Sequence, residues 1–327
     1  MRLIFIGSTK IGFECLKVVS ALAECEVVGI LTNPASFHIS YSNHRVTNIQ
    51  HTDFGPFAAA SEIPVHVMKG KMTHPDITTL VRGWRPDFIL VVGWFHMIPR
   101  SIRDIAPTGG LHASLLPDYS GGAPLVWAMI NGENKTGITF FLFDDAVDSG
   151  PIIGQSEVPI YKKDTIATLY SRIEMAALGL LQEHLPKIAS GQAVFKTQDE
   201  SKRRIFPQRN PEDGEIIWEW SAKRIYDFIR AQTKPYPGAF TFWKKKRFTI
   251  WCADIYPIPS KSRSLVPGEI TGIVDQLDCA GLSVASGQGN DAMLIKEVEE
   301  KGHKQESGVE FARRNKIVAA QGEILGR

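Results

Sequence analysis

The stretch that decides the fold reads Gly110-Leu111-His112-Ala113-Ser114-Leu115-Leu116-Pro117-Asp118-Tyr119-Ser120-Gly121-Gly122-Ala123-Pro124. It starts as a strand and continues into a loop rich in turn-forming residues. His112 therefore stands where the strand ends. Open α/β sheets bind their ligands at the carboxyl edge, which is where such strand ends meet. The sequence thus predicts that His112 lies at a ligand site.

A carboxylate is expected near this histidine. Asp148 lies in a turn that follows a second predicted strand, residues 136–143. An imidazole and a carboxylate presented by two strand ends can form a His–Asp pair, in which the carboxylate fixes the ring tautomer and stabilises the protonated ring. The alternative is that His112 is a core histidine with satisfied hydrogen bonds.

Strands and helices alternate on both sides of this stretch. Arg2–Ile6 is a compact apolar strand, and residues 13–22 have helical spacing before the next strand, Glu26–Thr32. Residues 87–92 form a continuous apolar run, as expected for a central parallel strand buried on both faces. The pattern predicts an α/β fold with a Rossmann-like doubly wound sheet. The turn at residues 7–12 lacks the G-x-G-x-x-G fingerprint, which weighs against a dinucleotide site.

The loop after the 87–92 strand is a second candidate for ligand binding. It reads Gly93-Trp94-Phe95-His96-Met97-Ile98. A glycine followed by bulky apolar groups at a carboxyl edge suits a flat ring held by backbone groups. Packing of these side chains under the next helix explains the same pattern equally well.

The chain of 327 residues is long enough for two domains with their own cores. Alternating strands and helices predict an α/β catalytic domain over residues 1–190. The polar residues 191–212 suit a linker. Short strands separated by glycine turns predict a small, OB-like β-barrel domain over residues 213–327.

Composition narrows the function classes. The formal net charge is +2 and the sequence pI about 8.3, which is too weakly basic to indicate nucleic-acid binding by itself. The four cysteines lack paired or metal-like spacing, which indicates reduced thiols in a cytoplasmic protein without a metal site. No apolar run approaches the roughly 20 residues that span a bilayer, so no membrane partner is expected.

Several motifs together resemble the formyltransferases that use 10-formyltetrahydrofolate. In the first domain they are His112-Ala113-Ser114-Leu115-Leu116-Pro117, Ala123-Pro124, Asn131-Gly132-Glu133 and Asp148-Ser149-Gly150. In the second domain Pro211-Glu212-Asp213-Gly214 and Pro235-Tyr236-Pro237-Gly238-Ala239-Phe240 are similar to the carboxyl-terminal domain of sugar-nucleotide and methionyl-tRNA formyltransferases. The resemblance covers nearly the whole chain.

The resemblance implies a mechanism and a donor site. A primary amine attacks the formyl carbon, while His112 hydrogen-bonds the developing oxyanion and moves the proton. Asp148 orients His112 and balances its charge. The loop from Gly93 to Ile98 is similar to the one whose backbone holds the pterin ring. Ser114, Leu115 and Asp144 are further candidates for contact with the folate co-substrate.

Two positions depart from the family pattern. Gly110 stands where the family has an asparagine that helps to hold the oxyanion, and losing one such donor typically costs roughly 10²–10³ in turnover. Ser120 stands where the family tends to have arginine. Either another donor acts, such as His96, Asn131 or the backbone N–H at Gly110, or the protein is weak, altered or inactive.

Three functions remain open at this point. The resemblance favours formyl transfer to a nucleotide-linked amino sugar. The first alternative is a methionyl-tRNA formyltransferase, for which the clusters at residues 202–204 and 244–247 would supply part of a basic surface. The second is a catalytically weakened member with a binding role, which the departures at Gly110 and Ser120 suggest. The oligomeric state stays open between a monomer and a homodimer, which sugar-modifying relatives often form.

Overall fold

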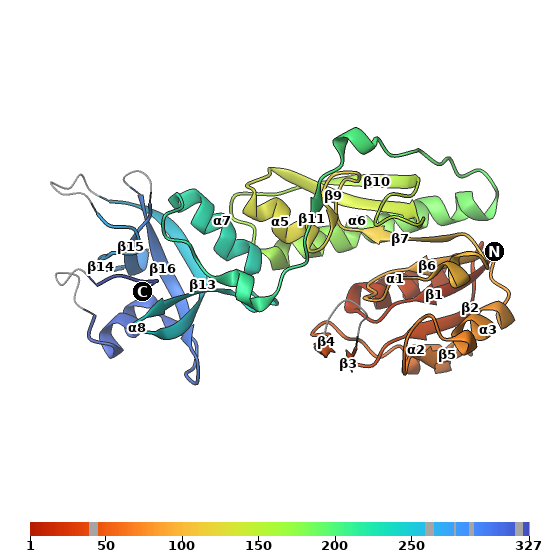
Figure 1. The fold of residues 1–327 in the computed structure, drawn as a ribbon, viewed down its shortest axis with the longest axis horizontal. Coiled ribbons are helices and arrows are strands. Elements are labelled where there is room, and N and C mark those ends of the chain that lie inside the picture. The colour runs from red at the N-terminus through yellow and green to blue at the C-terminus, as the bar shows by residue number, and fades with distance from the viewer. Residues whose placement is uncertain (39–44, 259–264, 278, 288–290, 318–322, 327) are drawn as a thin grey trace. The chain divides into compact units, whose positions relative to one another are not determined.

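The computed structural model describes residues 1–38, 45–258, 265–277, 279–287, 291–317 and 323–326. Its contacts divide the chain into two compact units, whose helices and strands are labelled in Figure 1. The first unit comprises Met1–Gly121, Thr136–Pro159 and Ser171–Phe206. The second comprises Gly122–Lys135, Ile160–Tyr170 and Pro207–Arg327.

The first unit is built on a seven-stranded sheet in the order β10-β9-β7-β6-β1-β2-β5. Strands β5, β2, β1, β6 and β7 are parallel, and β9 runs antiparallel to β7. The strands are β1 (Arg2–Ile6), β2 (Glu26–Thr32), β5 (Val65–Val67), β6 (Phe88–Val91), β7 (Thr108–His112), β9 (Lys135–Leu142) and β10 (Ile152–Pro159).

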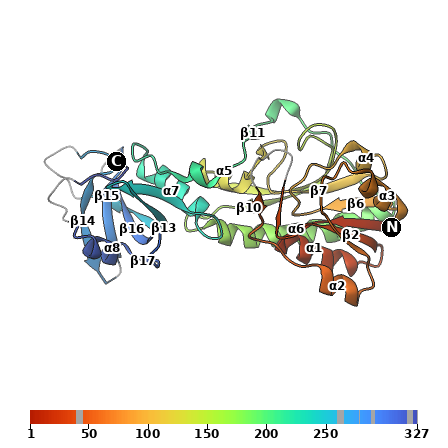
Figure 2. The same ribbon diagram turned by 60° about the horizontal axis from the view of Figure 1, so that its bottom comes forward.

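Side chains of β1 are buried on both faces of this sheet. Ile4 and Ile6 share a buried cluster with Ile77 and Ile102, which lie on two helices. Phe5 contacts Phe54, with ring centroids 6.1 Å apart. Because side chains alternate along a strand, Phe5 faces away from the Ile4 cluster. The helices are α1 (Lys10–Ser20), α2 (Gly55–Ala60), α3 (Pro75–Gly83), α4 (Arg100–Arg103) and α6 (Ile166–Ala189), and Figure 2 shows them around the sheet. The predicted doubly wound α/β sheet is confirmed.

The strand order reverses between β1 and β6, which makes this the switch point of the sheet. The turns that follow these two strands press together. A Cβ at Gly7 would collide with the carbonyl oxygen of Val92. Gly93 has φ +64°, and a Cβ there would collide with the hydroxyl oxygen of Thr9. Glycine is therefore required on both sides of a crevice that typically binds ligands in such sheets.

The second unit contains an antiparallel sheet in the order β12-β13-β16-β15-β14, with β17 paired to β16. Helix α8 packs on β15 and β16, and α5 packs on α7. Figure 2 shows α8 beside the sheet. The elements are α5 (Pro124–Ile130), α7 (Ala222–Gln232), β12 (Ala239–Trp243), β13 (Lys246–Pro257), β14 (Ile270–Gln276), β15 (Cys279–Ala285), β16 (Asp291–Glu300), β17 (Glu306–Ser307) and α8 (Gly308–Arg314). The predicted β domain is confirmed, and its OB-like character stays a prediction.

The contacts group the chain differently from the predicted contiguous ranges 1–190, 191–212 and 213–327. Helix α5 comes from the middle of the predicted first domain but belongs to the second unit, because its apolar face packs on α7. Residues 191–206 belong to the first unit, although residues 191–212 were expected to be a linker. Here β11 (Ile205–Phe206) pairs with β8 (Ser120–Gly121), directly beside the His112 loop.

Candidate functional site

His112 is the last residue of β7, and its side chain is 11% exposed. Its Nε2 atom lies 2.8 Å from the backbone carbonyl oxygen of Tyr119. A carbonyl oxygen only accepts hydrogen bonds, so Nε2 carries a proton. In the neutral ring the lone pair is then on Nδ1, which faces Asp148 Oδ2 at 3.6 Å. The Nδ1 atom is therefore the one that can take up and release a proton.

Asp148 lies in the turn between β9 and β10, and its side chain is 19% exposed. Its Oδ2 accepts a hydrogen bond from the backbone N–H of Gly121 at 2.8 Å. Its backbone has φ +52°, and that of Tyr119 has φ +54°. Such left-handed conformations cost roughly 1–3 kcal/mol each and concentrate at functional sites. The two residues that orient His112 are thus both held in unfavourable backbone conformations by their surroundings.

Buried hydrogen bonds anchor the loop that follows His112. The hydroxyl of Thr139 donates to the carbonyl oxygen of Ser114 at 2.7 Å and accepts from the N–H of Leu116 at 3.1 Å. The Ser114 hydroxyl donates to the carbonyl oxygen of Asp118 at 2.7 Å. Ser114 was expected to contact the co-substrate, and in this structure its hydroxyl is used within the loop itself.

A segment distant in sequence ties the His112 and Asp148 loops together; we call residues 196–206 the strap. Gln198 is buried, and its Nε2 donates to the carbonyl oxygens of Asp148 at 2.9 Å and Gly150 at 2.7 Å. Arg204 binds both carboxylate oxygens of Asp118 at 2.7 Å, and its guanidinium lies 4.9 Å from the ring centre of Tyr119. The strap therefore contacts both loops that carry the His–Asp arrangement.

Gly110 lies inside the sheet, in register with Val91 of β6 on one side and Phe141 of β9 on the other. A Cβ at this position would lie 2.6 Å from the ring of Phe143 and 2.6 Å from the carbonyl oxygen of Val91. An aromatic ring thus covers the position where the resemblance expects an asparagine. A role for the Gly110 backbone in holding an oxyanion stays a prediction.

The loop from Gly93 to Ile98 follows β6 at the switch point, and its residues have different surroundings. The carbonyl oxygen of Gly93 accepts from the N–H of Ser8 at 3.2 Å. Ile98 is buried in the apolar cluster, whereas Met97 is 58% exposed. Trp94 Nε1 is buried without a hydrogen-bond partner among the described residues. Part of this loop therefore packs in the core, at Ile98, and part of it is exposed, at Met97.

Phe95, Asp144 and Leu115 were also expected to contact the folate co-substrate. The ring of Phe95 packs on Phe37, with centroids 5.4 Å apart. Asp144 is exposed, and its Oδ1 accepts from the N–H of Ala146 at 3.1 Å and from the Ser149 hydroxyl, so it shapes the turn that carries Asp148. The side chain of Leu115 packs against Gly137 of β9.

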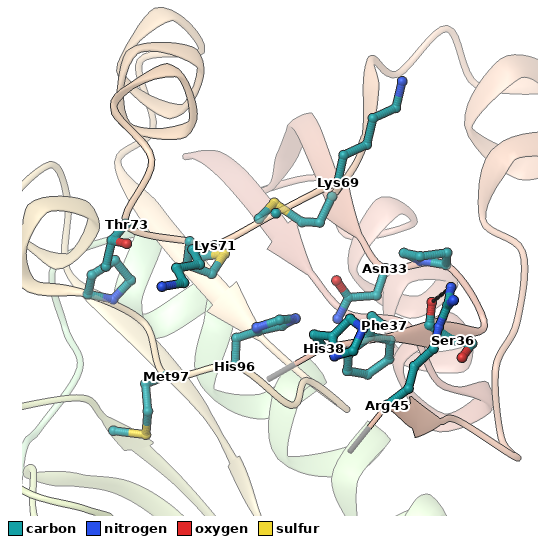
Figure 3. A pocket seen from close by; sticks show the side chains of 15 residues that line it. Asn33, Ser36, Phe37, His38, Arg45, Lys69, Lys71, Thr73, His96 and Met97 are labelled. Carbon is teal, nitrogen blue, oxygen red and sulfur yellow. Dashed lines mark hydrogen bonds between the residues drawn. The ribbon is translucent and has the colours of Figure 1, made fainter. Parts of the chain in front are cut away.

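A cavity of about 530 Å³ opens at the carboxyl ends of β2, β5 and β6 (Figure 3). Its walls include β3 (Ser36–Phe37) and the residues after β5, and His96 and Met97 border it. In Figure 3 the Asn33 amide and the His96 ring point toward one another across it. None of Gly110, His112 and Asp148 lines this cavity, whereas His96 and Met97 of the 93–98 loop do.

This arrangement suits proton transfer at an edge that also offers a ligand cavity. An imidazole fixed at Nε2 and facing a carboxylate through Nδ1 can act as a general base. Within the described residues, no three His, Cys, Asp or Glu side chains are placed to hold a metal ion. No helix in that part of the chain is both long enough and apolar enough to cross a bilayer.

Comparison with known families decides the class. Residues 23–185 match the family described as formyl transferase, and residues 209–316 match the formyl transferase C-terminal domain. The chain belongs to the formyl transferase family. The resemblance to this family that was based on the His112 and Asp148 motifs is confirmed.

Solved structures share the fold of this chain. HypX from Aquifex aeolicus, in complex with tetrahydrofolic acid, is 18% identical with TM-score 0.59; the match covers 95% of this chain and 47% of HypX. The chain therefore spans about half the length of HypX. The N-formyltransferase from Helicobacter canadensis, with folinic acid and dTDP-3-aminofucose, is 15% identical with TM-score 0.60, covering 90% and 98%. Methionyl-tRNA formyltransferase from Clostridium thermocellum is 22% identical with TM-score 0.52, covering 78% and 93%.

Sequence reasoning missed three residues that lie at or beside the candidate site. Gln198 and Arg204 lie in a polar segment, and nothing in a polar segment tells which loops it contacts. Asn33 directly follows β2, so the rule that ligands gather at carboxyl strand ends was a usable signal for it.

Proposed function

We propose that this chain transfers a formyl group from 10-formyltetrahydrofolate to the primary amine of a nucleotide-linked amino sugar. The observation that carries the proposal is the fixed orientation of His112, whose Nε2 faces the Tyr119 carbonyl and whose Nδ1 faces Asp148. A purely structural histidine would not need one ring nitrogen turned toward a carboxylate beyond hydrogen-bond distance. This argues for catalysis and against the alternative of a weakened member with a binding role.

His112 and Asp148 have different roles in the proposed transfer. When bound, 10-formyltetrahydrofolate supplies the formyl carbon, which the acceptor amine attacks. His112 Nδ1 takes the proton that the amine loses as its bond to that carbon forms. Asp148 stabilises the charged imidazole, which then returns the proton to the departing folate nitrogen as the old carbon–nitrogen bond breaks. Such proton transfer typically contributes about 10²–10⁴-fold in rate.

The folate is proposed to bind between the 93–98 loop and the His112 and Asp148 loops. The unpartnered Trp94 Nε1 fits a ligand there, because a buried donor gains a hydrogen bond when a polar ring binds beside it. The HypX complex contains tetrahydrofolic acid, and the Helicobacter canadensis complex contains folinic acid. Both ligands are folates, which supports a folate donor for this chain. Four free cysteines support a reducing, cytoplasmic location, and a homodimer stays a prediction.

The charge pattern favours a small acceptor over tRNA. Lys244 pairs with Glu323 at 2.9 Å, and Lys246 pairs with Glu300 at 3.5 Å. Arg204 in the other basic cluster binds Asp118. Basic residues already paired with carboxylates contribute little to phosphate-backbone binding. The dTDP-3-aminofucose in the Helicobacter canadensis complex is an acceptor of the proposed class.

Formyl transfer by the purified chain tests the proposal. With 10-formyltetrahydrofolate as donor, we expect a formylated product from a panel of nucleotide-linked amino sugars and none from initiator methionyl-tRNA, measured by mass spectrometry. His112→Ala should lower kcat by at least about 100-fold, because the proton acceptor is lost. Its control is His303→Ala, an exposed histidine in the second unit that should leave kcat unchanged.

Calorimetric measurement of 5-formyltetrahydrofolate binding distinguishes a wrong acceptor class from a wrong donor. Micromolar binding with no transfer to any amino sugar would contradict the acceptor class and leave the donor intact. No binding at millimolar ligand would contradict the folate donor itself. Full activity of His112→Ala would contradict the assigned base.

A further inference from the structure

The cavity beside Asn33 has the size of a binding site for a small organic ligand. Its volume of about 530 Å³ lies within the range of roughly 300–1,000 Å³ that is typical of ligand pockets. Parallel strands β2, β5 and β6 end at it, so it shares the carboxyl edge of the sheet with His112 at the end of β7. A ligand seated there would contact His96 and Met97 of the 93–98 loop, and this loop also borders the proposed folate site.

Asn33 is a buried polar residue in the lining of this cavity. The residue is 1% exposed, and neither its Oδ1 nor its Nδ2 has a hydrogen-bond partner among the described residues. Leaving a buried polar group unpaired costs about 1–3 kcal/mol. Figure 3 shows the amide directed into the cavity. A ligand with a donor next to an acceptor on one edge, as every nucleobase has, would satisfy both amide atoms at once.

Aromatic groups form the wall next to this amide. The ring of Phe37 is buried and lies 5.3 Å from that of His96, centre to centre. His96 Nε2 is also buried without a partner in the described part of the chain. Burial lowers the pKa of His96, so its ring is neutral near pH 7 and presents one donor and one acceptor. A flat heterocycle matches both the apolar ring surface and the unpaired nitrogen.

The charges around the cavity have one sign. Arg45, Lys69 and Lys71 line it, and its described lining contains no aspartate or glutamate. The Arg45 guanidinium donates to the Ser36 carbonyl oxygen at 3.2 Å, which fixes it near the mouth. Cations without a neighbouring carboxylate favour an anionic ligand, and phosphate groups accept from both Arg and Lys.

We propose that this cavity binds the nucleotide part of the acceptor, with the base edge on Asn33, the base plane against Phe37 and His96, and the diphosphate toward Lys71 and Arg45. The inference rests on the proposed function, which it deepens by placing the acceptor. The folate donor also carries a ring with such an edge and an anionic tail. The two sources differ in whether phosphate is present, and the experiment separates them.

Calorimetric titration with thymidine diphosphate and with uridine diphosphate, without any folate, tests the placement. We expect micromolar binding of at least one of them, and binding of pyrophosphate weaker by about tenfold or more because it lacks the ring. Asn33→Leu should weaken nucleotide binding by at least about tenfold, and Lys71→Ala by a similar factor. The control Asn134→Leu changes an exposed asparagine outside the cavity and should bind like the unmodified chain.

Thermal unfolding distinguishes a binding role of Asn33 from a structural one. Removing an unpaired buried amide in favour of an apolar side chain of similar size should leave Tm unchanged or raise it. A structural asparagine would instead lower Tm when replaced by leucine. A clear fall in Tm for Asn33→Leu would therefore contradict the inference.

Two further outcomes would overturn the placement and leave formyl transfer standing. One is nucleotide binding that is unchanged in Asn33→Leu. The other is loss of 5-formyltetrahydrofolate binding in Asn33→Leu with nucleotide binding retained, which would assign the cavity to the donor. Failure of the unmodified chain to bind either nucleotide would also overturn it. Failure of the proposed function is judged separately, by the transfer assay and His112→Ala.

Discussion

The ring of Phe143 fills the space that a side chain at position 110 would need. The ring of Phe143 lies 2.6 Å from where a Cβ at Gly110 would be, and it also packs on Phe141 with centroids 5.1 Å apart. Real Cβ atoms do not approach other atoms so closely, so a side chain at 110 requires the ring to move. Phe143, which directly follows β9, thus excludes an asparagine at position 110 unless its ring moves.

Restoring the family asparagine should harm the protein. Gly110→Asn is expected to destabilise the fold by about 1–3 kcal/mol through overpacking. The double variant Gly110→Asn with Phe143→Ala should recover part of this loss, because the ring that blocks the side chain is gone. Thermal unfolding of both variants measures the effect. An unchanged Tm together with a higher kcat in Gly110→Asn would show that the position is open to a catalytic amide.

At the level of elements, the strap contacts both the loop after His112 and the turn that carries Asp148. Gln198 holds the Asp148 turn through two carbonyl oxygens, while β11 pairs with β8 next to Tyr119. The ring of Tyr119 stacks on Phe206 at 4.5 Å with planes 7° apart. Because the Tyr119 carbonyl fixes His112 Nε2, the strap contacts the supports of both His112 and Asp148.

Breaking the Gln198 contacts should therefore reduce turnover more than binding. Gln198→Leu removes two hydrogen bonds worth roughly 1–3 kcal/mol together, and we expect kcat to fall about tenfold while the Kd of 5-formyltetrahydrofolate stays within twofold. Gln198→Glu keeps the shape but loses the donor, so it should show the same defect. Gln192→Leu, an exposed glutamine nearby, is the control. A defect in Leu but not in Glu would point to packing instead of hydrogen bonding.

For the whole molecule, the distribution of charge bears on the acceptor. The run from Lys244 to Arg247 is the most basic stretch of the second unit, yet two of its lysines pair with Glu323 and Glu300. In the first unit, Lys202 and Asp199 are 3.3 Å apart. With a net charge of only +2, the chain has little excess positive charge for a long polyanion.

Binding of initiator tRNA at physiological salt should accordingly be weak. The double variant Lys244→Ala with Lys246→Ala should change the rate of amino-sugar formylation by less than twofold, because both lysines are engaged with carboxylates. Filter binding across a range of salt concentrations measures the tRNA affinity. Tight binding with a steep salt dependence that the double variant reduces would favour the tRNA acceptor.

Much of the α/β unit follows from local sequence alone. Continuous apolar runs such as Phe88–Val91 specify strands buried on both faces, and a strand followed by glycine and turn residues places His112 at a carboxyl edge. These features depend on side-chain periodicity, which a sequence states directly. The proximity of His112 and Asp148 does not follow from strand ends alone, because β9 runs antiparallel to β7 and ends beside Gly109. The turn after β9 brings Asp148 back to the histidine.

Tertiary structure decided what periodicity cannot express. Residues 191–206 look like a linker because they are polar. Only the folded structure shows that Gln198 hydrogen-bonds the Asp148 turn and that Arg204 binds Asp118 in the loop after His112. Helix α5 joins the second unit because its apolar face fits α7, although it follows the His112 loop directly in sequence. The sequence by itself determined most of the elements and placed His112 at a carboxyl strand end. The partners of each polar side chain came from long-range packing, because hydrogen bonds between distant residues leave no periodic trace along the chain.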